Sequence, residues 1–361
     1  IIFAGNQEKD DEVRDLLEPL SSNLQTTSNI RPSITTEDLG PARAALARAF
    51  VGIRKKQIPG VEELDMWSGG RALPSVFAEG RIIHLLSKLY GPEKALLSVN
   101  LGASAATLSI GFSNRLQTKV YPHLGLGEGI SELLQHTSIE NIARWLSNDA
   151  SHQQISDYIY TKALYPNSIP ATEEDLQIEQ ALGREALRIA IETARQKLPD
   201  DIPVIKKNLL PLFEIILAGG SIISNAPTYG QSLLILLDAL QPTGISTLIL
   251  DQNNLLPALG TAADLNSILP VQALESGAFV NLATAVSPLS SARPGTGILK
   301  ASIKRADGSI STTVLKQGGF EVLPLKAGQV ADINLQPQHR ANIGYGPGRK
   351  IAMKVGGSAL G

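Results

Sequence analysis

Two short stretches carry residue types that could bind a phosphorylated ligand. Residues 98–111 read Ser-Val-Asn-Leu-Gly-Ala-Ser-Ala-Ala-Thr-Leu-Ser-Ile-Gly, in which a turn of small residues separates two apolar runs, as is typical of a β-hairpin. Residues 218–221 read Ala-Gly-Gly-Ser and follow another apolar run. Amide groups at such turns can donate hydrogen bonds to phosphate oxygens, and glycine lets a ligand lie close to the backbone. Together the two stretches predict a nucleotide site.

The candidate binding residues all belong to these two turns. They are Asn100, Gly102, Ala103, Ser104, Gly219, Gly220 and Ser221. None of them is charged, so we assign no catalytic residue and no metal ligand among them. Asp251 could supply a carboxylate, because α/β proteins bind ligands at the carboxyl ends of strands. A helix cap is the simpler interpretation of Asp251, and a satisfied strand-end amide is the simpler interpretation of Asn100.

Strands and helices must alternate to hold these turns, which favours an α/β fold. Besides the hairpin, the expected strands are 1–4, 24–30, 119–121, 214–217, 247–250 and 279–285. The expected helices are 10–20, 40–58, 75–90, 138–146, 153–164, 172–198, 229–240 and 255–263. Thr172 and Asp175 have the spacing of a capping box, which predicts where the longest helix begins.

Apolar side chains repeat every three or four residues in the first two expected helices. This spacing predicts one buried face on each of them. The residues concerned are Val13, Leu16, Leu17 and Leu20 in the first helix, and Leu46, Ala49, Phe50 and Ile53 in the second. The strand at 1–4 is expected to be buried as well.

The composition changes after residue 287. Residues 288–297 are rich in Pro, Ser and Gly and read as a linker, and beyond them apolar residues alternate with polar ones. Two such runs flank Asp307-Gly308, a strong hairpin signal, and further strands are expected at 320–323, 329–333 and 350–355. We therefore divide the chain into the end of a first lobe with connecting helices (1–92), a second lobe with a helical insertion (93–287) and a β-rich module (288–361).

The bulk composition excludes several functions. The net charge of −2 and the lack of a long basic run argue against nucleic-acid binding. No apolar stretch reaches the ~18 residues needed to span a bilayer, so we expect a cytoplasmic protein without a membrane partner. The absence of cysteine excludes thiol catalysis, and the five histidines form no HExxH pair. Residues 124–129, Leu-Gly-Leu-Gly-Glu-Gly, lack the spacing of a dinucleotide fingerprint and predict a glycine loop that enters a helix near 130–134.

Several short motifs occur in the order found in a known family. They are Ile-Ile-Phe-Ala-Gly-Asn at 1–6, Ser-Asn-Ile-Arg-Pro at 28–32, Gly-Pro-Ala-Arg at 40–43, Pro-Gly at 59–60, the hairpin at 99–108, and Leu-Ala-Gly-Gly-Ser at 217–221. Over roughly residues 1–285 the chain resembles the glutamate mutase accessory proteins (glutamate mutase L-like), within the actin, sugar-kinase and heat-shock-chaperone superfamily of ATPases. The resemblance implies ribonuclease-H-like lobes with ATP in the cleft between them. It also implies that part of the first lobe, with its phosphate loop, would precede residue 1.

The chain departs from the family pattern at the hairpin. That pattern has an aspartate after the first strand, then Gly-Gly, then Thr-Thr-Asp. The corresponding positions here hold Asn100, Gly102, Ala103, Ala105, Ala106 and Thr107. Because Mg²⁺ prefers carboxylate and other hard oxygen ligands, this substitution pattern implies that ATP hydrolysis is weak or lost. ATP, with Mg²⁺ only as its companion, would then bind weakly through Gly102, Gly219 and Gly220.

Three functions remain open at this point. The first is a degenerate ATPase-fold protein that acts as an accessory or chaperone-like factor for a cobalamin-dependent mutase, where cobalamin binds the mutase. The second is an active ATPase or phosphotransferase whose carboxylates come from the missing first lobe or from Asp251. The third is a non-catalytic assembly or scaffold protein, by analogy to actin. The sequence does not identify the partner or the oligomeric state.

Overall fold

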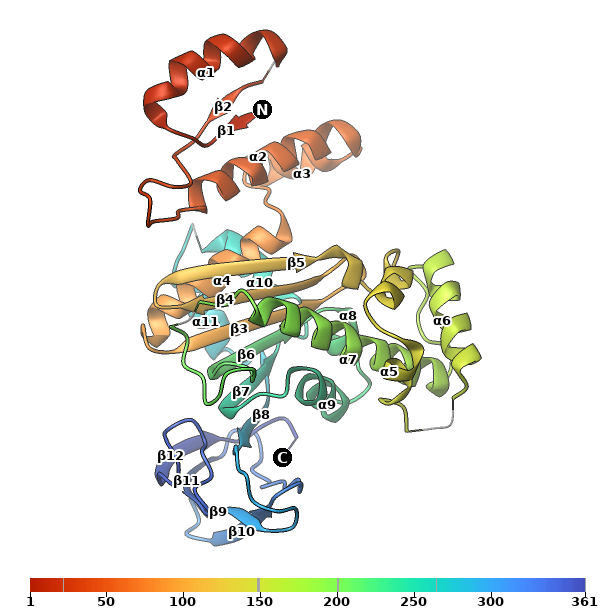
Figure 1. Cartoon of the computed structure of the whole chain (residues 1–361), viewed down its shortest axis with the longest axis vertical. Coiled ribbons are helices and arrows are strands. Elements are labelled where there is room, and N and C mark those ends of the chain that lie inside the picture. Colours follow the sequence, from red (N-terminus) through yellow and green to blue (C-terminus); the bar gives the residue numbers. More distant parts are fainter. Residues whose placement is uncertain (22, 148–149, 200, 264, 361) are drawn as a thin grey trace.

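The protein is described by a computed structural model that covers residues 1–21, 23–147, 150–199, 201–263 and 265–360. Three parts follow one another along the chain (Figure 1): a small N-terminal unit, a central α/β unit, and a β-rich unit at the C-terminus.

A six-stranded sheet forms the central unit. Its order is β5 (Arg115–Tyr121), β4 (Ala106–Phe112), β3 (Ala95–Leu101), β6 (Phe213–Gly219), β7 (Gly244–Leu250) and β8 (Val280–Ser287). The predicted hairpin is β3 and β4, and β5 continues it as an antiparallel meander. On the other side of β3, β6 and β7 run parallel to it, and β8 is antiparallel to β7. This mixed sheet, with its separate small antiparallel sheet, confirms the predicted fold class.

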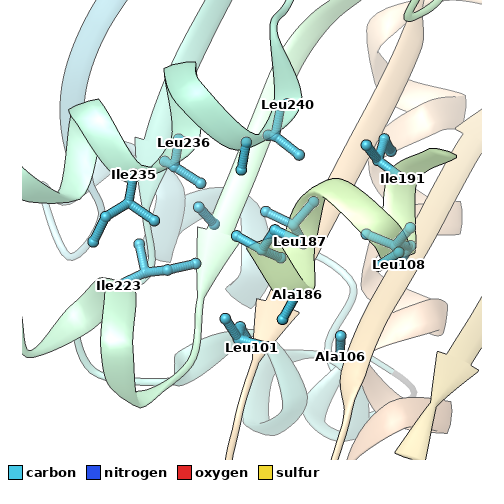
Figure 2. Close-up of a cluster of buried hydrophobic side chains, with 14 of the residues drawn as sticks. Leu101, Ala106, Leu108, Ala186, Leu187, Ile191, Ile223, Ile235, Leu236 and Leu240 are labelled. Carbon is cyan, nitrogen blue, oxygen red and sulfur yellow. The ribbon is translucent and has the colours of Figure 1, made fainter. Parts of the chain in front are cut away.

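Helices cover both faces of this sheet. On one face lie α4 (Ser75–Tyr90), α10 (Leu255–Ala262) and α11 (Leu269–Glu275), and on the other lie α7 (Glu173–Arg195) and α9 (Tyr229–Leu240). Successive side chains of β3 alternate between the two cores, because a strand points neighbouring residues to opposite faces. Leu96 packs with the α4 layer, whereas Leu101 packs with α7 and α9. Figure 2 shows that second core, where Leu101 and Leu108 face Leu187 of α7.

The helical insertion after β5 contains η3 (Pro122–Leu124), η4 (Ile130–Gln135), α5 (Ile139–Ala143) and α6 (His152–Leu164). The segment predicted as a helix near 130–134 is therefore a 3₁₀ helix. The predicted capping box at the start of α7 is confirmed: the Asp175 amide donates to Thr172 Oγ1 at 3.1 Å, and the Thr172 amide donates to the Asp175 carboxylate at 3.1 Å.

The N-terminal unit pairs β1 (Ile2–Phe3) with β2 (Gln25–Thr26) in parallel. Its helical segments are η1 (Gln7–Lys9), α1 (Asp10–Leu17), η2 (Glu18–Leu20), α2 (Gly40–Gln57) and α3 (Val61–Trp67). The prediction of buried faces here is wrong. Leu20 is 77% exposed and Leu46 is 60% exposed, since no described element of the chain packs over them, and β1 is only half-buried.

The C-terminal unit is an antiparallel sheet of order β10 (Ile310–Lys316), β9 (Gly297–Arg305), β11 (Val330–Pro337) and β12 (Ile351–Gly356). The predicted hairpin at Asp307-Gly308 is confirmed, with the Ser309 amide donating to Asp307 Oδ1 at 2.8 Å. The prediction of a strand at 320–323 is wrong. Phe320 and Val322 are exposed and belong to a segment without a ladder partner among the described strands.

Candidate functional site

The two predicted turns meet at the carboxyl edge of the central sheet. Asn100 at the end of β3 is paired with Gly219 at the end of β6. Gly220 follows with φ +94°, and a Cβ atom there would lie 2.2 Å from the carbonyl oxygen of Leu101. Only glycine satisfies both this backbone conformation and this close approach. The short helix α8 (Ser221–Ser224) then begins at Ser221.

Asn100 is held by a buried carboxylate that the sequence analysis missed. Its Nδ2 donates to Glu79 Oε2 at 3.3 Å, and Ser98 Oγ donates to Glu79 Oε1 at 2.6 Å. Burial raises the pKa of Glu79 above its usual range, and the nearby charge of Asp251 adds to this rise. The simpler interpretation of Asn100, a satisfied strand-end amide, agrees with this geometry. Glu79 could have been noticed as the one acid on the apolar face of α4, three and four residues before Ile82 and Ile83.

Asp251 is a helix cap. It is only 1% exposed, and its two carboxylate oxygens accept the amides of Leu255 and Leu256 at 2.8 Å each. These are the first two residues of α10, whose amides have no partner within the helix. Both carboxylates at this edge of the sheet are therefore engaged in structural hydrogen bonds.

The glycine loop at 124–129 is hydrogen-bonded to the hairpin turn. The Leu126 amide donates to Gly102 O at 3.1 Å, and the Gly127 amide donates to Ala103 O at 2.8 Å. A Cβ on Gly125 would lie 2.5 Å from Ala103 O, so this close contact explains the glycine there. Within the described chain the amides of Ala103 and Ser104 donate no hydrogen bond, and both residues are exposed. These two amides stay available to a ligand.

A cavity of about 250 Å³ opens beside the turn. It brings together Ala103 and Ser221, and the other five candidate residues do not line it. Its remaining walls are Leu126, Lys162, the loop 166–170, Leu176, Glu179, Gln180, Ile222, Asn225 and Ala226. The cavity therefore lies between the hairpin turn, the start of α8 and the helices α6 and α7.

Lys162, Glu179 and Gln180 line this cavity and are buried, and Tyr158 contacts Glu179 from outside the lining. Lys162 Nζ contacts Glu179 Oε1 at 3.2 Å and also donates to the carbonyl of Ser168, and the Tyr158 hydroxyl donates to Glu179 Oε2 at 2.5 Å. Burial, together with the hydrogen bond to Glu179, raises the pKa of Tyr158. Gln180 is 6% exposed, and its Nε2 has no hydrogen-bond partner among the residues that the structure describes. A buried donor without a partner is costly, and an acceptor placed against Gln180 Nε2 would remove this cost.

The model of a family described as "MutL protein" matches residues 1–276. The chain belongs to the MutL protein family. The resemblance to the glutamate mutase accessory proteins is thereby confirmed, and no protein with curated annotation matches the chain in sequence.

One solved structure, described as a PilM-PilN type IV pilus biogenesis complex, is 15% identical to this member of the family. The match covers 54% of this chain and 50% of that chain, with a TM-score of 0.24, so it spans about half of that protein. No helix in the described ranges is both long and apolar enough to cross a membrane.

The residues present do not suit a bound magnesium ion. Within the described ranges no three His, Cys, Asp or Glu side chains are grouped so that they could hold a metal. Asp251 and Glu79 face internal donors, and Asn100 is neutral. Among the described residues, Gln180 Nε2 and the amides of Ala103 and Ser104 donate no hydrogen bond.

Replacement of Asp251 by alanine is expected to lower the free energy of unfolding by about 2 kcal/mol, because α10 loses the acceptor for its first two amides. Chemical denaturation measures the change. The matched control is Asp307→Ala, which removes an exposed turn aspartate and should cost less than about 1 kcal/mol. Equal effects of the two substitutions would contradict the capping role.

Proposed function

We propose that this MutL family member is an accessory, chaperone-like factor for a cobalamin-dependent mutase, with a cleft that binds ATP and hydrolyses it slowly or not at all. Family membership supports an accessory ATPase-fold protein. The observation that carries the loss of hydrolysis is the engagement of both edge carboxylates: Glu79 accepts from Ser98 and Asn100, and Asp251 caps α10. Cobalamin would bind the mutase.

Within the cleft, different residues would bind the nucleoside and the phosphates of ATP. The 250 Å³ cavity would hold the nucleoside, with Gln180 Nε2 donating to an acceptor on its ring. The amides of Ala103 and Ser104 would donate to phosphate oxygens. Lys162 is paired with Glu179, so it neutralises the carboxylate and leaves the cavity without net charge. Any Mg²⁺ would be held by the nucleotide phosphates and water.

Gln180→Leu is expected to weaken ATP binding by about tenfold, since a lost buried hydrogen bond corresponds to roughly 1–1.5 kcal/mol. Isothermal titration calorimetry measures the dissociation constant for ATP. Gln177→Leu is the matched control, because Gln177 lies on the same helix but does not line the cavity. If both variants bound ATP like the parent chain, the nucleoside would not occupy this cavity.

The accessory role is tested with a cobalamin-dependent mutase of the same organism. The mutase is first inactivated by loading it with hydroxocobalamin, and the chain is then added with ATP and fresh coenzyme. Restored turnover that requires the chain supports the role. Failure to bind the mutase and to restore turnover would contradict it.

The active-enzyme alternative is less well supported, because Asp251 is committed to α10. One observation favours the scaffold alternative: α2 exposes apolar side chains, including Leu46, Phe50 and Ile53. Sedimentation at rising concentration separates it from the accessory role: growth into polymers would favour a scaffold, and a fixed small oligomer would count against one.

A further inference from the structure

A second and larger cavity, of about 580 Å³, lies between the central unit and the C-terminal unit. One wall is α9 and β8, with Leu233, Leu237 and Ala285. The opposite wall is the inner face of the C-terminal sheet, with residues from all four strands, and the segment 319–325 forms a third side. Figure 1 shows β9 to β12 next to β8 and α9.

The sheet wall of this cavity is apolar because side chains alternate between the two faces along each strand. Along β9 and β11, every second side chain is buried and apolar, including Ala301, Ile303, Ile333 and Leu335, while the residues between them, such as Lys304, face outward. In a packed sandwich a second apolar layer would fill the space against such a face. Here the same face also lines a cavity, so part of the space against it is open. An apolar ligand in that space would contact these side chains.

Charge restricts the ligand further. Among the described residues no lysine, arginine or histidine lines the cavity, and the two charged residues of the lining are the acids Asp238 and Glu321. Arg184 contacts Asp238 at 2.8 Å from outside the lining. An anionic head group would therefore find no cationic side chain among the described residues that line the cavity. The volume lies within the roughly 300–1,000 Å³ range of small-molecule sites.

We propose that this cavity binds an uncharged, mainly aliphatic small molecule. The aliphatic part lies between the inner face of the C-terminal sheet and Leu233 and Leu237 of α9. Exposed Phe320 and Leu360, which line the cavity and also contact solvent, border its mouth. This site is separate from the cleft at the hairpin turn, with which it shares no lining residue.

The test uses the neutral fluorescent probe N-phenyl-1-naphthylamine with the full chain. Saturable fluorescence enhancement is expected, and Ala301→Trp, which places an indole in the cavity, should weaken binding by about tenfold or more. Lys300→Trp is the matched control, because Lys300 is exposed on the opposite face of β9. If Ala301→Trp fails to fold, Ala283→Leu on the β8 wall replaces it.

Competition with 1-decanol and decanoate tests the charge argument. Decanol should displace the probe at about tenfold lower concentration than decanoate, because the lining holds acids and no cation. Probe binding that is absent, or unchanged in both cavity variants, would overturn the site. Equal displacement by the two competitors would overturn the assignment to an uncharged ligand.

Discussion

Gly220→Ala is expected to lower the free energy of unfolding by about 3 kcal/mol or more and to abolish ATP binding. The new Cβ would lie 2.2 Å from Leu101 O and 2.6 Å from Leu101 N, both of which are backbone atoms of a central strand. Alanine also disfavours the φ of +94° at this position. This steric clash can be relieved only if β3 moves away from the start of α8. Urea denaturation measures the stability, and calorimetry measures the binding.

Gly219→Ala is the matched control for this effect. A Cβ on Gly219 would meet Asp251 Cβ at 3.7 Å and Asn100 Nδ2 at 3.8 Å, which are ordinary contact distances. Gly219 also lacks the positive φ of its neighbour. The expected change in unfolding free energy is within about 1 kcal/mol. Similar losses for both variants would show that the close approach to Leu101 does not explain the second glycine.

Glu185→Ala is expected to destabilise the chain by about 3–5 kcal/mol, because Glu185 joins the helical insertion to α7. Its fully buried carboxylate accepts hydrogen bonds from Thr137 at 2.6 Å and Trp145 at 3.0 Å, and it pairs with Arg188 at 2.6 Å. Its removal leaves these donors without their acceptor. Glu192→Ala removes a half-exposed partner of the same Arg188 and should cost less than about 1 kcal/mol. Thermal and urea denaturation compare the two variants.

The same carboxylate predicts a pH dependence. Burial alone would raise the pKa of Glu185, but hydrogen bonds from Arg188, Thr137 and Trp145 outweigh it and lower the pKa to about 2 from the ordinary 4.5. A lowered pKa in the folded state means that its contribution is complete above about pH 4.5 and is lost as the pH falls toward 2. The loss is on the order of 3 kcal/mol. Glu185→Gln should flatten this part of the stability profile, and an unchanged profile would contradict the assignment.

Much of the fold could be predicted because strong local signals agree with the tertiary structure. The hairpin β3–β4, the helix α4, the capped start of α7 and the Asp307-Gly308 hairpin each follow from periodicity or from a specific turn residue. The N-terminal unit was predicted less well. Amphipathic spacing shows which face of α2 is apolar, but it does not show whether another element covers that face.

The candidate site was predicted in outline and not in its contacts. Sequence order places Asn100 and Gly219 at strand ends, and the parallel pairing of β3 with β6 brings them side by side. Glu79 and Gln180 were missed because α4 and α7 each carry several polar residues, and the sequence does not show which of them face inward. Only the packing of α4 against β3, and of α7 beside the hairpin turn, shows what each side chain faces. The seven candidate residues remain a prediction for binding measurements to test.

One calorimetric and kinetic experiment tests directly our proposal that the cleft binds ATP and hydrolyses it slowly or not at all. ATP is titrated into the chain in Mg²⁺ and in EDTA, and phosphate release is followed in the same samples. We expect ATP to bind in both conditions, more weakly to Gln180→Leu, with phosphate release close to that from ATP alone. Phosphate release that requires Mg²⁺ and disappears in Asp251→Ala would contradict the proposal.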